Sequence, residues 1–247
     1  MNVLVCISKT PETTTKIKFT ADDTALDTNG VQYIMNPYDE WYALVRAIEL
    51  KEKHGGKVTI INVGPAGNDA TLRKGLAIGA DEAVRVNAEP QSALFVAKQI
   101  AEYAKGESFD MVLLGKETID YNGSEIGAMV AEYLDMPFIS YASKLEMESA
   151  DSATLERDIE GGTEQVALKP PFVLSAAKGL AEQRIPNMRG IMMAKRKPLK
   201  AIDPVAFEDA AVTVSFDLPP EKSAVKLIEP DNMEELVRLL HEEAKVI

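Results

Sequence analysis

One segment of this chain, residues 111–130 (MVLLGKETIDYNGSEIGAMV), constrains the fold more than any other. A short apolar run ends at Gly115, a polar loop follows, and a helical pattern begins near Ser124. In α/β proteins, a strand that leads through a Gly- and Ser-containing loop into a helix commonly holds phosphate, because free N–H groups and the positive end of the helix dipole face the anion. The sequence therefore predicts an α/β fold with a nucleotide site in this loop.

The same alternation of strand and helix runs through the first half of the chain. The hydrophobic pattern predicts strands at 2–8, 58–63, 82–86 and 111–115, and helices at 38–54, 69–78, 90–104 and 124–134. A polar insertion at 11–35 is predicted to form a hairpin. This order is typical of a mostly parallel sheet covered by helices, an adenine-nucleotide-binding (Rossmann-like) fold whose ligands bind beyond the carboxyl ends of the strands.

From Tyr141 onward the pattern changes. Four runs, KLEMES, ATLERDI, EQVALK and FVLSA, are predicted to be strands joined by short turns. A long irregular loop is expected at 177–194, an extended arm at 195–231, and an amphipathic helix at 233–245. We therefore predict an α/β domain at 1–195 and a C-terminal arm with a helix at 196–247.

Composition excludes several classes of protein. Acidic residues outnumber basic ones 39 to 27, giving a net charge of −12, so non-specific nucleic-acid binding is not expected. No apolar run approaches the roughly 20 residues of a transmembrane helix, and MNVLVCISKT lacks the pattern of a signal peptide. The single Cys6 cannot form an internal disulfide, so a cytoplasmic protein, or its mitochondrial-matrix equivalent, is expected.

Catalytic signatures are absent from the sequence. There is no Walker P-loop, no GxGxxG, no Cys/His cluster for a metal ion and no spacing that marks a catalytic acid pair. His54 and His241 fall at predicted helix ends and are expected on the surface, and Cys6 is expected to pack in the core. The chain is thus predicted to keep a nucleotide without catalysing a reaction.

Three further loops are expected to meet residues 120–127 at one edge of the sheet. They are Cys6–Lys9, Asn36–Asp39 and Val63–Pro65. Each has a purely structural interpretation: Asn36 and Pro37 can begin a helix, and a glycine after Val63 can make a plain turn. Asp39 and the Asn36 backbone can also hydrogen-bond an adenine or a ribose. Because four loops converge on one edge, we favour a nucleotide pocket.

A second candidate surface is the segment RIPNMRGIMM at 184–193, which holds apolar residues in a polar setting. It is either a buried loop or an exposed anchor for a partner, a role to which flexible methionine side chains are suited. Basic residues follow it, at Lys195, Arg196, Lys197 and Lys200, as a loop end or as a docking patch for an acidic partner.

Five segments together resemble the small (beta) subunit of electron-transfer flavoproteins along nearly the full chain. They are MNPYDE, NVGPAGNDATLRKGLAIGAD, MVLLGKETIDYNGSEIGAMVAEYLDMP, ERDIEGGTEQVALKPP and RIPNMRGIMMAKRKP, in the order and spacing of that family. The resemblance implies a heterodimer with a large (alpha) subunit, a buried structural AMP in the small subunit, and a redox FAD held mostly by the large one.

The resemblance also implies particular residues. The AMP positions are Cys6, Asn36, Pro37, Tyr38, Asp39, Val63, Asp120, Tyr121, Asn122, Gly123, Ser124, Glu125, Ile126, Gly127, Ala128 and Ala131. Tyr38 corresponds to an aromatic residue near the flavin ring, whereas the family's second aromatic falls at Thr13. In the loop 120–127, Tyr121, Gly123, Ser124 and Glu125 replace a commoner form that is richer in Asp and Gln.

For partners, the resemblance places an acidic residue that steadies the FAD domain at Asp158 and a recognition loop for acyl-CoA dehydrogenases at about 178–195. Its apolar anchor, a leucine in familiar members, falls at Met188, with Arg184, Ile185, Pro186 and Ile191 beside it. The C-terminal arm would wrap the large subunit.

The resulting hypothesis is an electron carrier, not an enzyme, that accepts electrons from flavin dehydrogenases and passes them through FAD to a quinone-linked oxidoreductase. One alternative is the small subunit of an electron-bifurcating flavoprotein with a second FAD in place of AMP. Another is a stand-alone adenine-nucleotide-binding regulatory protein.

Overall fold

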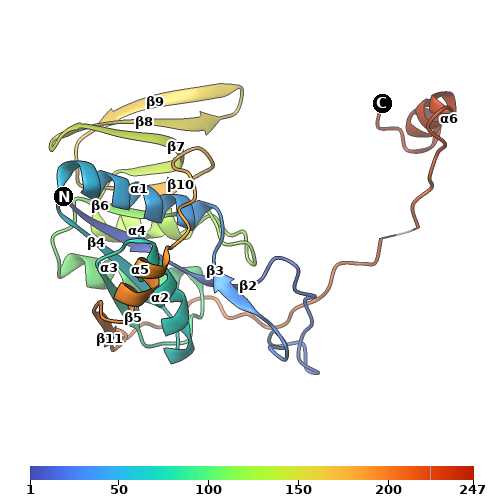
Figure 1. Ribbon diagram of the computed structural model, residues 1–247. Helices are drawn as coiled ribbons and strands as arrows, with labels where there is room; N and C mark the ends of the chain where they lie inside the picture. The colour runs from blue at the N-terminus through green and yellow to red at the C-terminus, as the bar shows by residue number, and fades with distance from the viewer. Residues whose placement is uncertain (223) are drawn as a thin grey trace.

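The computed structural model describes residues 1–222 and 224–247. In this part of the chain, one sheet has the strand order β11-β5-β4-β1-β6-β10-β7-β8-β9 (Figure 1). Its strands are β1 (Asn2–Cys6), β4 (Lys57–Val63), β5 (Glu82–Val86), β6 (Met111–Gly115), β7 (Phe138–Ser149), β8 (Ser152–Ile159), β9 (Gly162–Leu168), β10 (Phe172–Ala176) and β11 (Leu199–Ile202). A separate hairpin pairs β2 (Lys9–Pro11) with β3 (Tyr33–Met35), as predicted for the polar insertion.

Helices cover both faces of the sheet. They are α1 (Asp39–His54), α2 (Asp69–Ile78), α3 (Ala93–Lys105), α4 (Ile126–Leu134) and α5 (Met188–Ala194), with the short helical turn η1 (Ala66–Asn68). The helix α6 (Met233–Arg238) and the turn η2 (Leu239–Glu243) lie away from the sheet, at the end of the chain (Figure 1). On β1, Val3 and Val5 join a core with α1 and α2, whereas Leu4 and Cys6 join a second core with α3 and α4. The two cores follow from the period of two in a strand, which sends neighbouring side chains to opposite faces.

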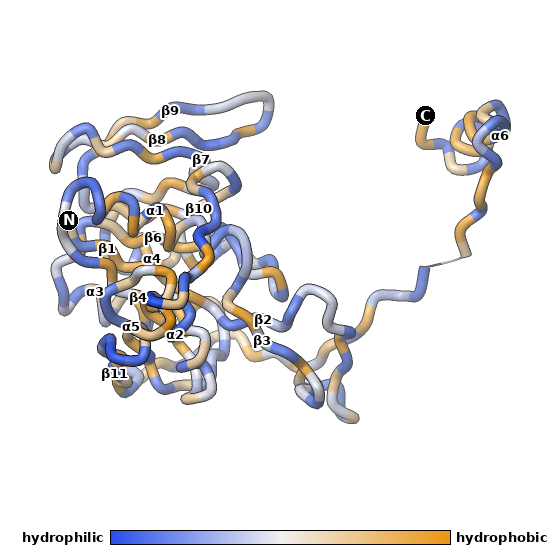
Figure 2. The backbone as a smooth tube through the Cα atoms, in the orientation of Figure 1, coloured by the Kyte–Doolittle hydropathy of each residue, from blue (hydrophilic) through white to orange (hydrophobic). Residues whose placement is uncertain are grey.

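The predicted fold class is confirmed. The strands from β11 to β7 in the sheet order are all parallel to one another, and the β7–β8 and β8–β9 pairs are antiparallel. The central strands are strongly apolar, whereas β8 and β9 at the edge are largely polar (Figure 2). Strands that are buried on both faces are expected to be continuously apolar. In a sheet with one face in water, apolar and polar residues are expected to alternate along each strand.

The strand order reverses at β1. From β1 the chain builds outward through β4 to β5, and it then returns to place β6 on the other side of β1. Open α/β sheets bind ligands beyond the carboxyl strand ends at such a switch point, because the helices diverge there and leave a crevice. The loops after β1, β4 and β6 therefore surround the expected binding crevice.

Two helix starts differ from prediction. α3 begins at Ala93, not Pro90, because the Ser92 side chain caps it by accepting from the Phe95 N–H at 3.0 Å. α4 begins at Ile126, not Ser124, because Ser124 and Asn122 have positive φ angles of 55° and 50°. The loop before α4 is thus longer than the pattern indicated.

The segment predicted as an irregular loop at 177–194 contains α5. Gly190 lets α5 lie against α2: a Cβ at this position would stand 2.4 Å from the Ala77 carbonyl oxygen. Asn187 caps α5 by accepting from the Gly190 N–H at 2.8 Å. The helix forms because a neighbouring element receives it, which a local pattern does not reveal.

The arm after β11 first follows the domain and then leaves it (Figure 1). Gln99 exchanges two hydrogen bonds with the Val205 backbone, at 2.9 and 2.8 Å, and Phe207 meets Phe95 edge to face. Farther along, Phe216 stacks on Phe19 of the polar insertion at 5.2 Å. The division at residues 195 and 196 stays a prediction, and β11 beyond it belongs to the sheet.

Within the described ranges, no helix is long and apolar enough to cross a membrane.

Candidate functional site

The four predicted loops lie at the carboxyl edge of the sheet. Register places Cys6 beside Ile61 on β4 and Val5 beside Leu113 on β6, so the segments after Cys6, Val63 and Gly115 leave the sheet next to one another. The loop from β6 then leads to the N-terminus of α4. The topology thus brings together segments that are more than a hundred residues apart.

Asn36 joins three of these segments. Its backbone N–H donates to the Ser8 carbonyl at 3.0 Å, its side-chain Nδ2 donates to the Glu117 carbonyl at 3.0 Å, and its Oδ1 accepts from the Ile119 N–H at 3.1 Å. The side chain is buried, so these bonds are shielded from water. Asn36 therefore ties the end of β1 to the loop after β6 and shapes the crevice from behind.

The start of α1 places two carboxyl groups at this edge. Glu40 is 4% exposed and its Oε2 accepts from the Ser8 N–H at 2.6 Å. Burial raises the pKa of Glu40 to about 8, opposed by the Ser8 hydrogen bond and aided by Asp120 and Asp39. Burial likewise raises the pKa of Asp39 to about 6, with Lys116 acting in the opposite direction. A neutral Glu40 lowers the negative charge behind a site proposed to hold an anion.

Tyr38 stands at the mouth of the crevice. It is the N-cap residue of α1, with φ 65° and ψ −101°, and is 53% exposed. A positive φ is an outlier for a bulky residue, and such strain persists where the surroundings enforce it, often at a functional site. The conformation sets an aromatic ring into solvent beside Asp39, where an aromatic ligand can stack on it.

The loop before α4 exposes polar groups to the crevice. Tyr121 is 73% exposed, and Asn122 and Ser124 adopt left-handed conformations. In the described chain Glu125 makes no side-chain cap on α4, and its carboxylate lies close to Gly123, 3.2 Å from where a Cβ there would stand. The first N–H groups of α4 therefore receive no cap from the Glu125 side chain, and N–H groups at a helix start can bind an anion.

Deeper residues of the predicted set have packing roles. Gly127 permits α4 to approach β7, because a Cβ would stand 2.8 Å from the Phe138 ring. Ala131 and Val63 are buried in the core, and Ile126 packs against it. Cys6 is buried, and burial raises the pKa of its thiol, which disfavours the nucleophilic thiolate. The remaining predicted residues, Pro37 and Ala128, lie at the starts of α1 and α4.

The sequence analysis did not identify two residues that lie at this edge of the sheet. One is Glu40, whose burial is decided by the packing of α1 on β6. The other is Tyr141, whose hydroxyl lies 3.0 Å from the Ser124 Oγ. Tyr141 follows the change of pattern after α4, and no local signal relates it to a loop seventeen residues earlier.

Residues 178–195, which we call the docking segment, expose apolar side chains to solvent, as expected of an anchor for a partner. Ile185 is 84% exposed, Met188 74% and Met192 67%. Its base is held by the domain: Trp41 Nε1 donates to the Arg184 carbonyl at 3.2 Å. Arg184 itself pairs with Glu52 at 2.7 and 3.1 Å, so its charge is engaged within the chain. The exposed apolar side chains favour the interpretation as an anchor for a partner over that as a buried loop.

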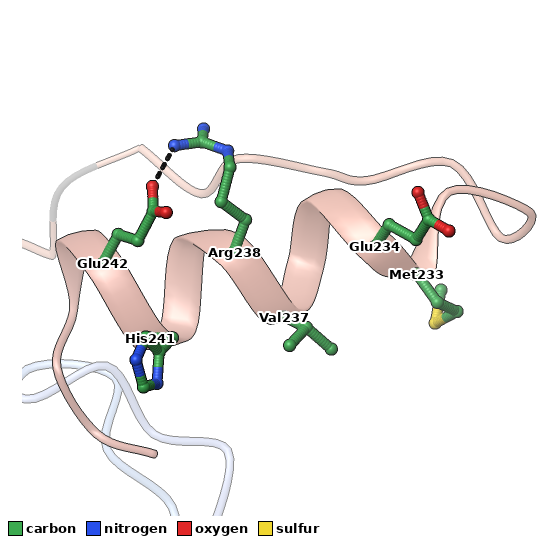
Figure 3. Close-up of a pocket in the computed structure, with 6 residues that line it drawn as sticks. All are labelled: Met233, Glu234, Val237, Arg238, His241 and Glu242. Carbon is green, nitrogen blue, oxygen red and sulfur yellow. Dashed lines mark hydrogen bonds and ion pairs between the residues drawn. The ribbon is translucent and has the colours of Figure 1, made fainter.

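Asp158 and the terminal helix lie apart from the crevice. Asp158 is exposed at the end of β8, opposite Thr163 of β9. On the terminal helix, Met233 and Val237 project on one side, away from the Arg238–Glu242 ion pair at 3.0 Å (Figure 3). Met233 and Val237 are 49% and 55% exposed, so this apolar side is open to a partner. His54 and His241 are both exposed, as predicted.

The loop before α4 and its surroundings offer groups that can bind an anion. The start of α4 supplies N–H groups, and Ser124 and Tyr121 supply hydroxyls. Lys116 lies nearby, with its Nζ 5.9 Å from the centre of the Tyr141 ring and 3.2 Å from a carboxylate oxygen of Glu117. The left-handed residues Asn122 and Ser124 turn the loop around this space. Backbone donors at a helix start are suited to phosphate.

Comparisons with known proteins agree on one family. The family model described as "Electron transfer flavoprotein domain" matches residues 23–206. The electron transfer flavoprotein subunit beta of Bacillus subtilis is 38% identical over 261 aligned positions, which cover all of both chains. The protein of the same name from Homo sapiens is 36% identical over all of this chain and 99% of its own. The one from Bradyrhizobium diazoefficiens is 33% identical over all of both chains.

Proposed function

The chain belongs to the electron transfer flavoprotein family as a beta subunit, and we propose that it works as an electron carrier subunit that holds a structural AMP and positions the FAD of an alpha subunit. The observation that carries the proposal is the convergence of Asn36, Tyr38 and the loop 120–125 at the switch point of the sheet. We assign no catalytic side chain, because the redox chemistry belongs to the flavin.

In this proposal AMP is held by the four loops together. The start of α4 and Ser124 bind the phosphate, whereas Asp39 and the backbone after Val63 face the base and the ribose, with Asn36 holding these segments from behind. The buried Glu40 limits repulsion because it is neutral near pH 7, given a pKa of about 8. The nucleotide would stabilise the fold by linking segments that only this edge brings together.

FAD would be shared with the alpha subunit. When bound, the flavin supplies one- and two-electron chemistry. Tyr38 offers its exposed ring to the isoalloxazine, and Asp158 offers a carboxylate to a cation of the alpha subunit. The arm and the apolar side of the terminal helix, with Met233 and Val237, would bury against that subunit.

The docking segment would engage flavin dehydrogenases, such as acyl-CoA dehydrogenases, with electrons passed on to a quinone-linked oxidoreductase. An apolar tip on a fixed base suits transient docking, because little conformational entropy is lost on binding. Met188 is the proposed anchor. Met188→Asp should slow electron transfer from the donor and leave the FAD content intact, whereas Met188→Leu should behave as the unaltered protein. Equal rates for Met188→Asp would remove this role.

The first experiment is to co-purify the chain with its alpha subunit, denature the complex and count the released nucleotides by chromatography. One FAD and one AMP per heterodimer is the expected result. Two FAD and no AMP would replace the proposal with an electron-bifurcating subunit whose loop 120–131 holds a flavin. A chain that is stable and binds adenine nucleotide without any partner would point to a regulatory protein.

A further inference from the structure

Tyr141 occupies an unusual place at the edge of the sheet. Between the pairs Leu174–Ile139 and Ala176–Ala142, two residues of β7 oppose the single residue Ser175 of β10. This is a β-bulge, a feature that re-aims side chains and is common beside functional sites. Tyr141 lies in the bulge at the level where β6 and β10 end, because Ala176 also pairs with Gly115.

The backbone of the bulge is held in a costly conformation. Tyr141 has φ 55°, a value that bulky residues rarely adopt. The buried hydroxyl of Ser175 accepts from the Tyr141 N–H at 3.1 Å, and Arg157 donates to the Ser140 hydroxyl at 3.2 Å. The Ser175 hydroxyl thus supports this backbone conformation, and the Tyr141 side chain extends to Ser124 of the loop before α4.

The hydroxyl of Tyr141 reaches the loop before α4. It lies 3.0 Å from the Ser124 Oγ, and Ser124 is itself in the left-handed region with φ 55°. Two left-handed residues, Asn122 and Ser124, make a conformation that needs outside contacts to persist. Among the described residues, Tyr141 supplies the side-chain hydrogen bond to Ser124 from another element, and it is 42% exposed.

We infer that Tyr141 is a positioning residue for the nucleotide phosphate: through Ser124 it holds the loop 120–125 in the shape that leaves the start of α4 open to the anion. This inference rests on the proposed nucleotide site and adds to it a residue of β7. The Lys116 Nζ lies 5.9 Å from the centre of the Tyr141 ring and pairs with Glu117 at 3.2 Å.

The test is a double-mutant cycle on the full chain in complex with its alpha subunit. Tyr141→Phe keeps the ring and removes the hydroxyl, and Ser124→Ala removes its partner. The readout is the rate at which bound AMP exchanges with labelled AMP. Tyr141→Phe should exchange about fivefold faster, the ratio that corresponds to one hydrogen bond; Ser124→Ala, which also loses its own contact with the phosphate, should exchange faster still, and the double variant no faster than Ser124→Ala.

Two controls separate positioning from a general loss of structure. Tyr133→Phe removes a hydroxyl from α4 on a ring that packs beneath Lys98, and it should exchange as the unaltered protein does. The melting temperature after removal of AMP should be equal for Tyr141→Phe and the unaltered complex, because the bond is exposed.

Unchanged exchange in Tyr141→Phe, or effects that add in the double variant, would overturn the inference. An unaltered complex that holds no adenine nucleotide would instead refute the proposed site, and with it this role of Tyr141.

Discussion

Replacing Glu40 with glutamine should make the protein more stable in alkaline solution. The Glu40 carboxyl group is buried at the start of α1, where its Oε2 accepts from the Ser8 N–H. Burial raises its pKa to about 8, and the negative charges of Asp120 and Asp39 raise it further. In the unfolded chain a glutamate has an ordinary pKa of about 4.3.

The direction of this pH dependence follows from the number of protons that the folded and the unfolded protein bind. Between about pH 4.3 and pH 8 the folded protein keeps a proton on Glu40 that the unfolded chain has lost, so stability falls as pH rises through this window. Each pKa unit is worth about 1.4 kcal/mol, so Glu40 should lower the free energy of unfolding by on the order of 3–5 kcal/mol between pH 4.3 and pH 8. Glutamine is uncharged throughout and can still accept from the Ser8 N–H.

The assay is urea unfolding followed by the fluorescence of Trp41, the single tryptophan of the chain, at pH 5, 6, 7 and 8. Glu40→Gln should match the unaltered protein near pH 5 and exceed it increasingly toward pH 8. Glu102→Gln is the control, because hydrogen bonds from Lys98 and Lys105 lower the pKa of Glu102 and its titration lies below this range. A difference between Glu40→Gln and the unaltered protein that does not change with pH would refute the reasoning.

Three further outcomes are expected. Gly190→Ala should push α5 away from the Ala77 carbonyl, at a cost of about 1–3 kcal/mol, and slow electron transfer from the donor while the nucleotide content stays constant; normal rates would show that α5 adapts. Gln99→Ala removes both hydrogen bonds to Val205, so limited proteolysis should cut the start of the arm faster, and equal cleavage rates would contradict this. Asp158→Ala should alter electron-transfer rates without changing the number of bound nucleotides, and unaltered rates with unaltered mobility of the flavin domain would argue against its role.

Much of the fold was predictable because its signals are local. The strands β5 and β6 and the helix α2 have the predicted bounds, since an apolar run or a 3.6-residue period between turn residues is visible within one segment. The edge at which the four loops gather could be predicted from one rule of topology: parallel strands joined by helices have their carboxyl ends at the same edge of the sheet. The resemblance to a family added residues that no spacing could assign.

The predictions that were wrong concern elements whose structure depends on contacts between distant segments. Residues 177–194 were expected to be an irregular loop, but they contain the helix α5. This helix forms because Gly190, which has no side chain, packs against Ala77 of α2, more than a hundred residues earlier. Pro90 did not begin α3, since Ser92 is the residue that accepts from a helix N–H. These outcomes depend on which partner a segment meets, and a pattern within one segment does not contain that information.

The sequence by itself therefore determined the order of strands and helices, the parallel sheet and the edge at which its loops gather. Only the tertiary structure decided the state of the groups at that edge. Glu40 keeps its proton because α1 packs its carboxyl group away from water, and Tyr141 reaches Ser124 because a bulge between β7 and β10 turns it there. Periodicity is a property of neighbours along the chain, whereas burial and contact are properties of neighbours in space.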